Sequence, residues 1–318
     1  MKILVLGAGA IGGYFGARLQ QAGADVTFLV RSRRAAQLAE HGLAVRSPYG
    51  DFDVQPRWVE ASAVPAPYDL VLLTCKAYDL DGALEAIAPA MGPSTHVLPL
   101  LNGLSHLDRL AQTFGAERVV GGCCSIPVTL GPKGEVLHLA KMHRIAFGPL
   151  PGTSPDARPK LEQLHAFLSK APVDSVLADD MRQEMWEKFV GLCTLAAMTC
   201  LMRAAVGDIV SSDEGRALMT EALDACAGTA TANGHPPREA AMGGFRRMLF
   251  DPTSSGMASM LRDLEGGHRT EGRHVVADML RRARAAGVDP GPLRAAWCHL
   301  ESHELRARRQ AQVNSTNS

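Results

Sequence analysis

The sequence predicts an α/β fold in which an N-terminal Rossmann-type, doubly wound parallel sheet is followed by an all-α C-terminal domain. In the first half, apolar runs of strand length alternate with helical segments, and a glycine-rich turn directly follows the first run. After about Val173 the alternation stops and long helical segments take its place. The length of 318 residues, roughly twice that of a typical domain, agrees with two domains.

Short apolar runs define the expected strands of the first half. They alternate with helical segments over residues 11–21 and 33–41, and this repeating order implies parallel strands covered on both faces. The stretch 148–159, rich in Pro and Gly, is expected to be a loop. Strands are expected at residues 2–6, 25–30, 69–74, 96–101, 118–120 and 144–147.

The helical segments of the second half carry recognisable end signals. Gly234 and Gly287 each follow such a segment, where glycine suits a left-handed cap and a nearby proline prevents continuation. We expect a Rossmann-type domain over residues 1–173, an all-helical domain over 174–307 and a flexible polar tail over 308–318. Helices of the second domain are expected at residues 179–199, 214–233, 237–248, 255–264, 271–286 and 292–308.

Composition argues against several classes of partner. Lys plus Arg equals Asp plus Glu at 33 each, so no net charge draws the chain to nucleic acid or to an anionic membrane. No window resembles a membrane span of about 20 apolar residues, and residues 1–6 are too short an apolar run for a signal peptide. The 7 cysteines include no CxxC pair, so we expect reduced thiols, no metal site and a cytoplasmic protein.

A dinucleotide-binding motif stands at the start of the chain as Gly7-Ala8-Gly9-Ala10-Ile11-Gly12. The pattern is weak alone, but here it follows a predicted strand and opens a predicted helix. The glycines permit the tight turn, the approach of the backbone to a pyrophosphate and close helix packing, while the helix N-terminus offers N–H groups to the phosphates. These six residues are candidate cofactor ligands; the alternative is a glycine-rich turn that binds nothing.

Basic residues follow the second predicted strand, as Arg31-Ser32-Arg33-Arg34. An NAD-selective site places a carboxylate at this point for the ribose hydroxyls, so a cation in its place favours NADP(H). Arg31 is the first candidate for a 2′-phosphate ligand. The alternative is the solvated start of a helix.

Other polar residues are ordinary when each is taken alone. Lys76 and Asn102 follow predicted strands, at the carboxyl ends where such sheets bind ligands. Lys188 interrupts an otherwise apolar helical segment, where a lysine either reaches solvent or has a function. Ser259 and Glu271 lie in the second half without a distinguishing context of their own.

Taken in order, these residues resemble those of the ketopantoate reductase (2-dehydropantoate 2-reductase) family over nearly the whole chain. The family also has an NADPH-binding Rossmann domain followed by a helical domain. The match comprises Gly7-x-Gly9-x-x-Gly12, Arg31, Thr74-x-Lys76, Asn102-Gly103, Trp186-Glu187-Lys188, and Ser259-Met260-Leu261-x-Asp263 before Thr270-Glu271.

The resemblance implies reduction of a 2-oxo acid with NADPH, as of ketopantoate in pantothenate biosynthesis, and it assigns residue roles. Lys188 is implied to be the general acid, which suits the negative charge that hydride addition develops on a carbonyl oxygen. Asn102 is implied to contact cofactor and substrate, and Glu271 to organise the site as a carboxylate on the cofactor side. Ser259 is implied to donate to the substrate carboxylate, and Lys76 to lie in the cofactor pocket.

Three asparagines that are common in the family's substrate site are replaced. Leu192 and Ala196 stand four and eight positions after Lys188 on one helix face, and Val206 replaces a further asparagine. Loss of hydrogen-bonding groups from a pocket favours apolar substrates, with Thr199 as a partial compensation. We therefore expect a 2-oxo acid that is more apolar or bulkier than ketopantoate, with ketopantoate itself as the other candidate.

Other interpretations stay open. An NADP-dependent dehydrogenase that oxidises a hydroxy acid would use the same scaffold, and cofactor preference separates it from a reductase. A non-catalytic NADP-binding sensor or scaffold is disfavoured by the joint presence of Lys188, Asn102 and Glu271. Whether the chain forms a homodimer is left undecided by the sequence.

Overall fold

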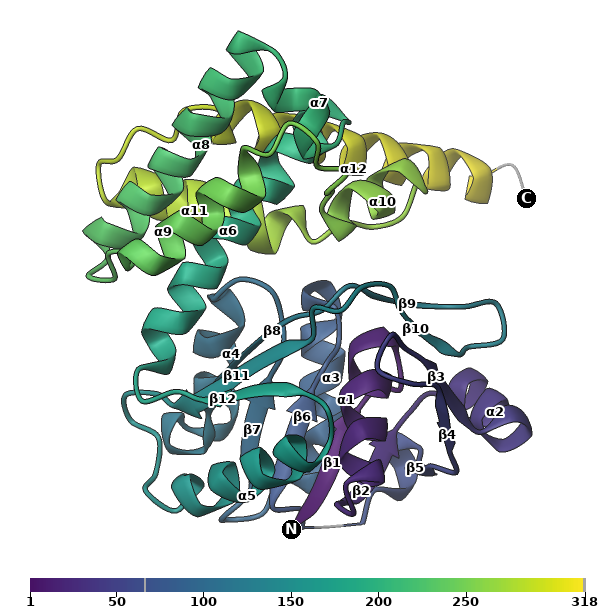
Figure 1. The fold of residues 1–318 in the computed structure, drawn as a ribbon. Helices are drawn as coiled ribbons and strands as arrows, with labels where there is room; N and C mark the ends of the chain where they lie inside the picture. The colour runs from purple at the N-terminus through teal and green to yellow at the C-terminus, as the bar shows by residue number, and fades with distance from the viewer. Residues whose placement is uncertain (66, 317–318) are drawn as a thin grey trace. The chain divides into compact units, whose positions relative to one another are not determined.

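The computed structural model describes residues 1–65 and 67–316 and divides the chain into two compact units. Unit 1 comprises Met1–Leu101 and His106–Glu184, and unit 2 comprises Asn102–Ser105 and Met185–Ser318. Figure 1 shows the α/β character of unit 1 and the helical character of unit 2, which confirms the predicted fold class.

The main sheet of unit 1 is parallel, with strand order β5-β2-β1-β6-β7. In the centre, Leu6 lies opposite Leu29 on one side and Leu73 on the other. Because the strand order reverses at β1, the carboxyl ends of the strands there form the edge at which such sheets bind ligands. The strands are β1 (Lys2–Leu6), β2 (Asp25–Leu29), β5 (Arg57–Val59), β6 (Leu70–Leu73) and β7 (His96–Pro99).

Two smaller sheets complete unit 1, with strand orders β4-β3-β10-β9 and β12-β11-β8. Most of these strands have three or four residues, too few to show an alternating pattern in the sequence. The first group is β3 (Leu43–Arg46), β4 (Phe52–Val54), β9 (Val128–Leu130) and β10 (Val136–His138). The second is β8 (Val120–Ser125), β11 (Arg144–Pro149) and β12 (Asp174–Leu177).

The expected domain boundary at residue 173 is wrong, because β12 pairs with β11 in parallel and so belongs to unit 1. The predicted strand over 118–120 is displaced to β8, and the predicted loop over 148–159 is shortened by the start of helix α5. The helices of unit 1 are α1 (Ala10–Gln21), α2 (Ser32–His41), α3 (Leu80–Ile87), α4 (Ser105–Phe114) and α5 (Ala157–Lys170), with 3₁₀ turns at Ala61–Ala63, Ala77–Asp79, Ala88–Ala90 and Ala116–Arg118.

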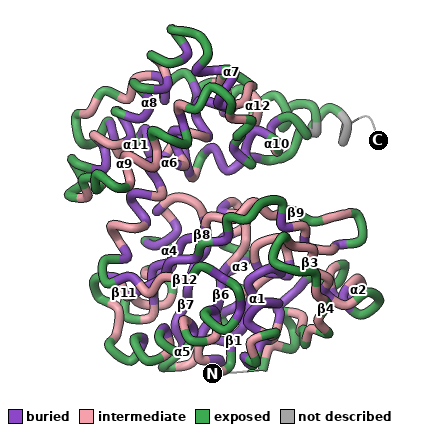
Figure 2. The backbone as a smooth tube through the Cα atoms, in the orientation of Figure 1, coloured by how far each residue is buried: buried purple, intermediate pink, exposed green. Residues whose placement is uncertain are grey.

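Helix α1 is buried along most of its length and packs on the sheet through glycine. A Cβ atom at Gly16 would lie 2.5 Å from the ring of Phe28 on β2, so only glycine permits this approach. On its other side, Gly13 faces Val136 of β10, whose Cγ2 would lie 2.8 Å from an added Cβ. Figure 2 shows the buried segments of β1, β6 and α1 that form this core.

Unit 2 consists of helices joined by short loops. Its core is built by apolar side chains such as Met198, Val276 and Met279, all without exposed surface. The last helix continues through the polar stretch that was expected to be a flexible tail from residue 308, because no Gly or Pro follows Pro292 to end it. The helices are α6 (Met181–Met202), α7 (Val206–Val210), α8 (Asp213–Ala232), α9 (Glu239–Leu249), α10 (Ser259–Glu265), α11 (Gly272–Ala285) and α12 (Leu293–Thr316).

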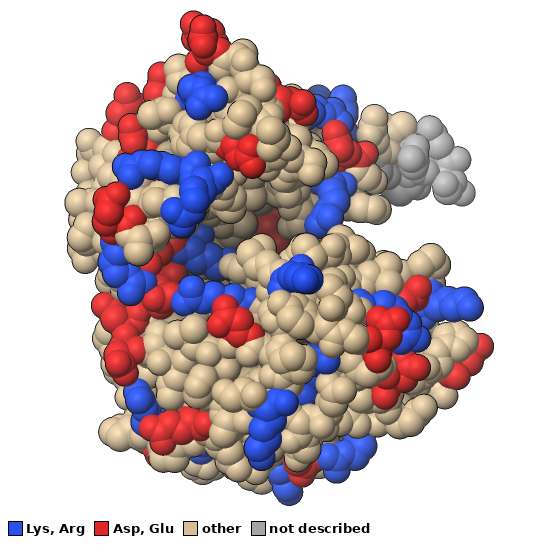
Figure 3. Space-filling view, viewed as in Figure 1, with Lys and Arg blue, Asp and Glu red and all other residues tan. Residues whose placement is uncertain are grey.

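Among the described residues, α6 is the one helix that is long and apolar enough to cross a membrane by length and composition. The expectation that no window of the sequence resembles a membrane span is therefore wrong for this helix by length and composition. Within the fold 72% of its most apolar window is buried, so packing accounts for its apolar character. On the face in Figure 3, basic and acidic side chains are interspersed.

A cluster of aromatic and histidine side chains lies between α1 and the strands that cover it. Tyr14 Oη and His143 Nδ1 are 2.9 Å apart, and the ring of Tyr49 stacks on His143 with centroids 4.0 Å apart. Burial lowers the pKa of His143, and the neighbouring His138 and Arg18 lower it further. The neutral imidazole is therefore the form that this packing stabilises.

Replacement of His143 by Gln is expected to weaken the acid sensitivity of the fold. Below about pH 6.5 the unfolded chain takes up a proton that folded His143 resists, so the free energy of unfolding falls with falling pH. The slope of Tm between about pH 7.5 and 5.5 should be shallower in His143→Gln. The control is His41→Gln, an exposed position on α2, which should keep the original slope. An unchanged slope in His143→Gln would contradict this account.

Candidate active site

The glycine-rich turn lies at the carboxyl end of β1, as predicted. Gly7 has a φ of +91°, and its N–H donates to Leu29 O at 2.9 Å. A Cβ atom at Gly12 would lie 2.1 Å from Gly7 O and 2.4 Å from Thr74 Oγ1, whereas an added Cβ at Gly9 would meet no atom within 4 Å. The turn is thus crowded toward the sheet at Gly12 and open at Gly9, the N-cap of α1.

The side chains of neighbouring elements hold this turn. Thr74 follows β6 and donates from Oγ1 to Leu6 O at 2.7 Å. Because Leu6 and Gly7 are adjacent, this bond ties the turn to the end of a second strand. The first turn of α1 contains no acidic side chain, so the partial positive charge of its N-terminus is unopposed there. These features suit the phosphates of a dinucleotide.

The expected 2′-phosphate ligand, Arg31, is the N-cap residue of α2, directly after β2 and Val30. Its side chain is 87% exposed, and its Nη2 lies 3.6 Å from Oδ2 of Asp79. Asp79 belongs to the 3₁₀ turn that begins after Lys76, which is half-buried. The structure therefore brings Arg31 near the segment after β6, and the cofactor-pocket role of Lys76 stays a prediction.

Three predicted residues come together within unit 2. Lys188 Nζ, on α6, lies 3.4 Å from Asn102 Oδ1, and Asn102 Nδ2 lies 3.4 Å from Glu271 Oε2 at the N-cap of α11. The amide thus presents its acceptor to the ammonium and its donor to the carboxylate, the one orientation that satisfies both charges. Both distances are at the long end of the hydrogen-bond range, as is common for catalytic groups without substrate.

The backbone around Lys188, Asn102 and Glu271, called the Lys188 triad from here on, is closely packed. Gly103 has a φ of +81°, and a Cβ atom there would lie 2.5 Å from His274 O. Burial lowers the pKa of His274, while the nearby Glu271 carboxylate opposes this shift. Sterics therefore explain why glycine follows Asn102 in this motif. Only glycine at position 103 lets Asn102 lie this close to the first turn of α11.

Glu187, which stood out in the sequence only as part of a motif, anchors α6 to α9. Its carboxylate accepts from the backbone N and the Nε of Arg238, both at 2.8 Å, and from Nη2. Arg238 is the N-cap residue of α9, where a buried carboxylate also complements the helix dipole. One turn further along α6, the ring of Phe245 covers Gly191, so α9 lies against the segment that carries Lys188.

Ser259 is not part of the triad. It is the exposed first residue of α10, and the preceding backbone N–H, that of Ala258, lies 3.4 Å from Thr199 Oγ1 on α6. Of the three positions where the family commonly has asparagine, Ala196 and Val206 are fully buried in unit 2, and only Leu192 is partly exposed. Of the apolar residues expected in the substrate pocket, only Leu192 therefore keeps exposed surface. The burial of the other two side chains in the core could not be predicted from the sequence.

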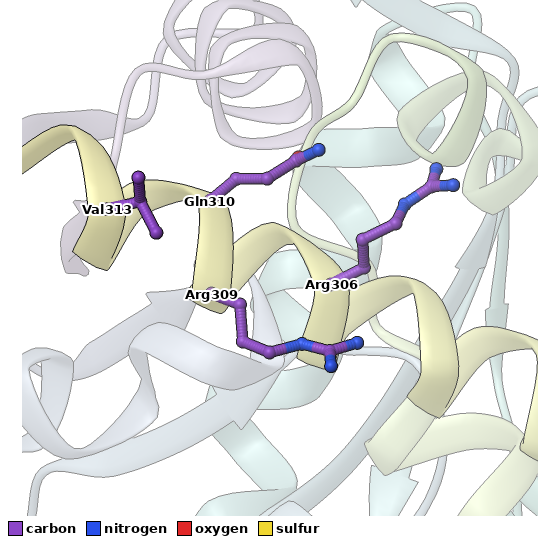
Figure 4. Close-up of a pocket in the computed structure, with 4 residues that line it drawn as sticks. All are labelled: Arg306, Arg309, Gln310 and Val313. Atoms are coloured by element: carbon purple, nitrogen blue, oxygen red, sulfur yellow. The ribbon is translucent and has the colours of Figure 1, made fainter.

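Two surface hollows of unit 2 lie elsewhere. One of about 520 Å³ is lined by side chains of α12 alone, and Figure 4 shows them projecting from that helix: Arg306, Arg309, Gln310 and Val313. The other, of about 580 Å³, involves Leu280 and Trp297 on α11 and α12. Neither includes a member of the Lys188 triad. Within residues 1–65 and 67–316, no group of three or more His, Cys, Asp or Glu is arranged for a metal ion.

Comparison with known proteins identifies the family. Residues 3–152 match the ketopantoate reductase PanE/ApbA family, and residues 180–297 match its C-terminal region. The chain belongs to the ketopantoate reductase family. Membership of this family makes the chain an oxidoreductase and indicates a nicotinamide cofactor.

Individual relatives cover nearly the whole chain. An uncharacterized oxidoreductase, YkpB of Bacillus subtilis, is 31% identical over 304 residues, which cover 96% of this chain and 99% of YkpB. The crystal structure of 2-dehydropantoate 2-reductase from Geobacter metallireducens is 30% identical, with a TM-score of 0.85 over 95% of this chain and 99% of that one. D-mandelate dehydrogenase, crystallised with NADH and anilino(oxo)acetate, shares the fold at 21% identity, with a TM-score of 0.85 over 97% and 100%.

Glu187→Gln is expected to destabilise unit 2, because the neutral amide keeps the shape of the carboxylate but not its charge-assisted bonds to Arg238. The expected loss is about 1–2 kcal/mol in the free energy of unfolding, measured by urea denaturation. The matched control is Glu239→Gln, whose carboxylate pairs with Arg246 on the surface and is 88% exposed. It should change stability by less than about 0.5 kcal/mol. Equal effects of the two substitutions would contradict the anchoring role.

Proposed function

We propose that this member of the ketopantoate reductase family reduces a 2-oxo acid with an apolar side chain to the 2-hydroxy acid, with NADPH as reductant. The observation that carries the proposal is the placement of Asn102 between Lys188 and Glu271, with both hydrogen-bond distances at 3.4 Å. An ammonium held by an amide and backed by a carboxylate is a suitable donor to a carbonyl oxygen.

The residues of unit 2 supply the acid and the orientation that the reaction needs. The bound NADPH would supply the hydride for the carbonyl carbon. Lys188 Nζ hydrogen-bonds the carbonyl oxygen, stabilises the negative charge that develops on it and then gives it a proton. Asn102 Oδ1 keeps the ammonium directed, and Glu271 holds the Asn102 amide through Nδ2. Asn102 follows the last residue of β7 by three positions in the chain.

The residues of unit 1 fit a dinucleotide phosphate group. The open space at Gly9 and the unopposed N-terminus of α1 admit a pyrophosphate, while Arg31 and Lys76 supply positive charge beyond β2 and β6. We favour NADPH over NADH because no carboxylate ends β2, where an NAD-selective site has one. The NADH complex of D-mandelate dehydrogenase shows that this fold also accepts the cofactor without the 2′-phosphate.

The apolar substrate follows from Leu192, which stands one turn after Lys188 on the same helix face and keeps exposed surface. A leucine there cannot hydrogen-bond a substrate hydroxyl and offers apolar contact instead. The anilino(oxo)acetate in D-mandelate dehydrogenase is a 2-oxo acid derivative with an aromatic group, so the fold accommodates such groups. Ketopantoate remains the competing substrate.

Lys188→Ala is expected to lower kcat by about 10²- to 10⁴-fold and to leave the dissociation constant of NADPH nearly unchanged, because the ammonium acts mainly in the transition state. Kcat follows from NADPH oxidation at saturating substrate, and the dissociation constant from a fluorescence titration. The control is Lys170→Ala, at an exposed lysine of α5, which should keep kcat. Equal losses in turnover and cofactor binding in Lys188→Ala would contradict the assigned role.

The substrate proposal is tested by comparing kcat/KM for ketopantoate with that for aliphatic, branched and aromatic 2-oxo acids, with NADPH and NADH in parallel. We expect an apolar 2-oxo acid with NADPH to give the highest value. Leu192→Asn should shift the ratio toward ketopantoate by roughly fivefold, since one hydrogen bond is worth about 1 kcal/mol. A wild-type preference for ketopantoate would overturn the apolar substrate and leave the reductase chemistry in place.

A further inference from the structure

Arg34 lies in the first turn of α2, and its guanidinium hydrogen-bonds to backbone carbonyl oxygens of the protein. Its Nε donates to Ala8 O at 2.9 Å, and its Nη2 donates to Gly134 O at 2.8 Å in the turn between β9 and β10. A third bond runs from Nη1 to Gln37 Oε1 at 3.2 Å. The single N–H of Nε is therefore committed to the middle of the glycine-rich turn.

The turn between β9 and β10 is shaped to receive this side chain. Gly134 has a φ of +81°, and a Cβ atom there would lie 2.1 Å from Arg34 Nη1. Its N–H donates to Gly131 O at 3.0 Å, which closes the turn and presents the Gly134 carbonyl outward. Arg34 thus links three segments that are separate in the sequence: the glycine-rich turn, α2 and the β9–β10 hairpin. Figure 1 labels α2, β9 and β10, as well as β1 and α1, which flank the turn.

The bond to Ala8 O has a consequence for the cofactor side of the turn. The Ala8 carbonyl and the Gly9 N–H belong to one planar trans peptide, so they point in opposite directions. Holding the carbonyl toward Arg34 directs the Gly9 N–H away from Arg34. Thr74 holds Leu6 O in the same way two residues earlier, so both bonds orient the backbone of the turn.

Arg34 differs in this respect from Arg31. The Arg31 side chain is 87% exposed and has a single carboxylate near it, whereas Arg34 is half-buried, and this burial lowers its pKa. Burial of a guanidinium is costly, and the two carbonyl acceptors offset that cost. Two of the three arginines in the basic run after β2, Arg31 and Arg34, therefore have different surroundings.

We propose that Arg34 is a positioning residue for the cofactor: it orients the Ala8–Gly9 peptide toward the pyrophosphate and does not discriminate between NADPH and NADH. Arg31 is the residue that reads the 2′-phosphate. The inference rests on the dinucleotide site of the proposed function, but it does not depend on which 2-oxo acid is reduced.

Cofactor binding to the full chain, measured by fluorescence titration with NADH and NADPH separately, tests the proposal without any substrate. Arg34→Ala should raise the dissociation constants of both cofactors by about the same factor, roughly tenfold, so that their ratio is unchanged. Arg31→Ala should raise that of NADPH alone. Arg57→Ala removes a cation at the amino end of β5, where it pairs with Asp25, and should change neither constant.

Arg34→Lys provides a second variant if Arg34→Ala does not fold. An ammonium keeps the charge but cannot bridge two carbonyls as the planar fork does, so both constants should again rise together, by a smaller factor. A rise for NADPH alone in either variant would make Arg34 a 2′-phosphate ligand and overturn the proposal. A lowered Tm with both constants unchanged would also overturn it, since that result describes a purely structural arginine.

Failure of the proposed function has a different signature. A chain that binds both cofactors as described but reduces no 2-oxo acid leaves the role of Arg34 intact and removes the reductase proposal. The opposite outcome would be an Arg34→Ala variant that reduces a 2-oxo acid at the wild-type rate even at low cofactor concentration. That result would rule out the role of Arg34 and leave the reductase proposal intact.

Discussion

The contact of Gly12 with the Gly7 carbonyl and the Thr74 hydroxyl is the constraint on which the rest of unit 1 depends. A side chain at position 12 would overlap both atoms, at 2.1 and 2.4 Å. Because α1 starts this close to the ends of β1 and β6, the helix is buried under further structure, and its N-terminus remains beside the glycine-rich turn. Close packing and nucleotide binding thus require the same residue type at one position.

The small sheet β4-β3-β10-β9 of unit 1 contributes to this packing in two ways. It covers the outer face of α1 through Val136 and carries the turn whose Gly134 carbonyl receives Arg34. The small strands are therefore more than a cover for apolar surface, since their hairpin connects to the backbone of the cofactor turn through one guanidinium. A scaffold that holds backbone amides in fixed directions loses little entropy when an anion binds.

In unit 2, two adjacent charges on α6 have separate tasks because a helix turns by about 100° per residue. Glu187 points to the N-terminus of α9 and fixes it, and Lys188 points to Asn102. The apolar character of α6, which satisfies the length and composition of a membrane span, reflects its place inside a helical core. The Lys188 ammonium is directed toward the amide oxygen of Asn102, 3.4 Å away.

The sequence by itself determined the parallel sheet, the helical second half and the glycine-rich turn, because repeating apolar runs and glycines at fixed spacing are local signals. The ordered motif with Asn102, Lys188 and Glu271 also pointed to the family. Tertiary structure alone decided that these three side chains meet, that Ala196 is buried, and that Arg34 is bound to two carbonyls. Such facts depend on contacts between residues far apart in the chain, and neither periodicity nor spacing records which distant groups a fold brings within hydrogen-bond distance.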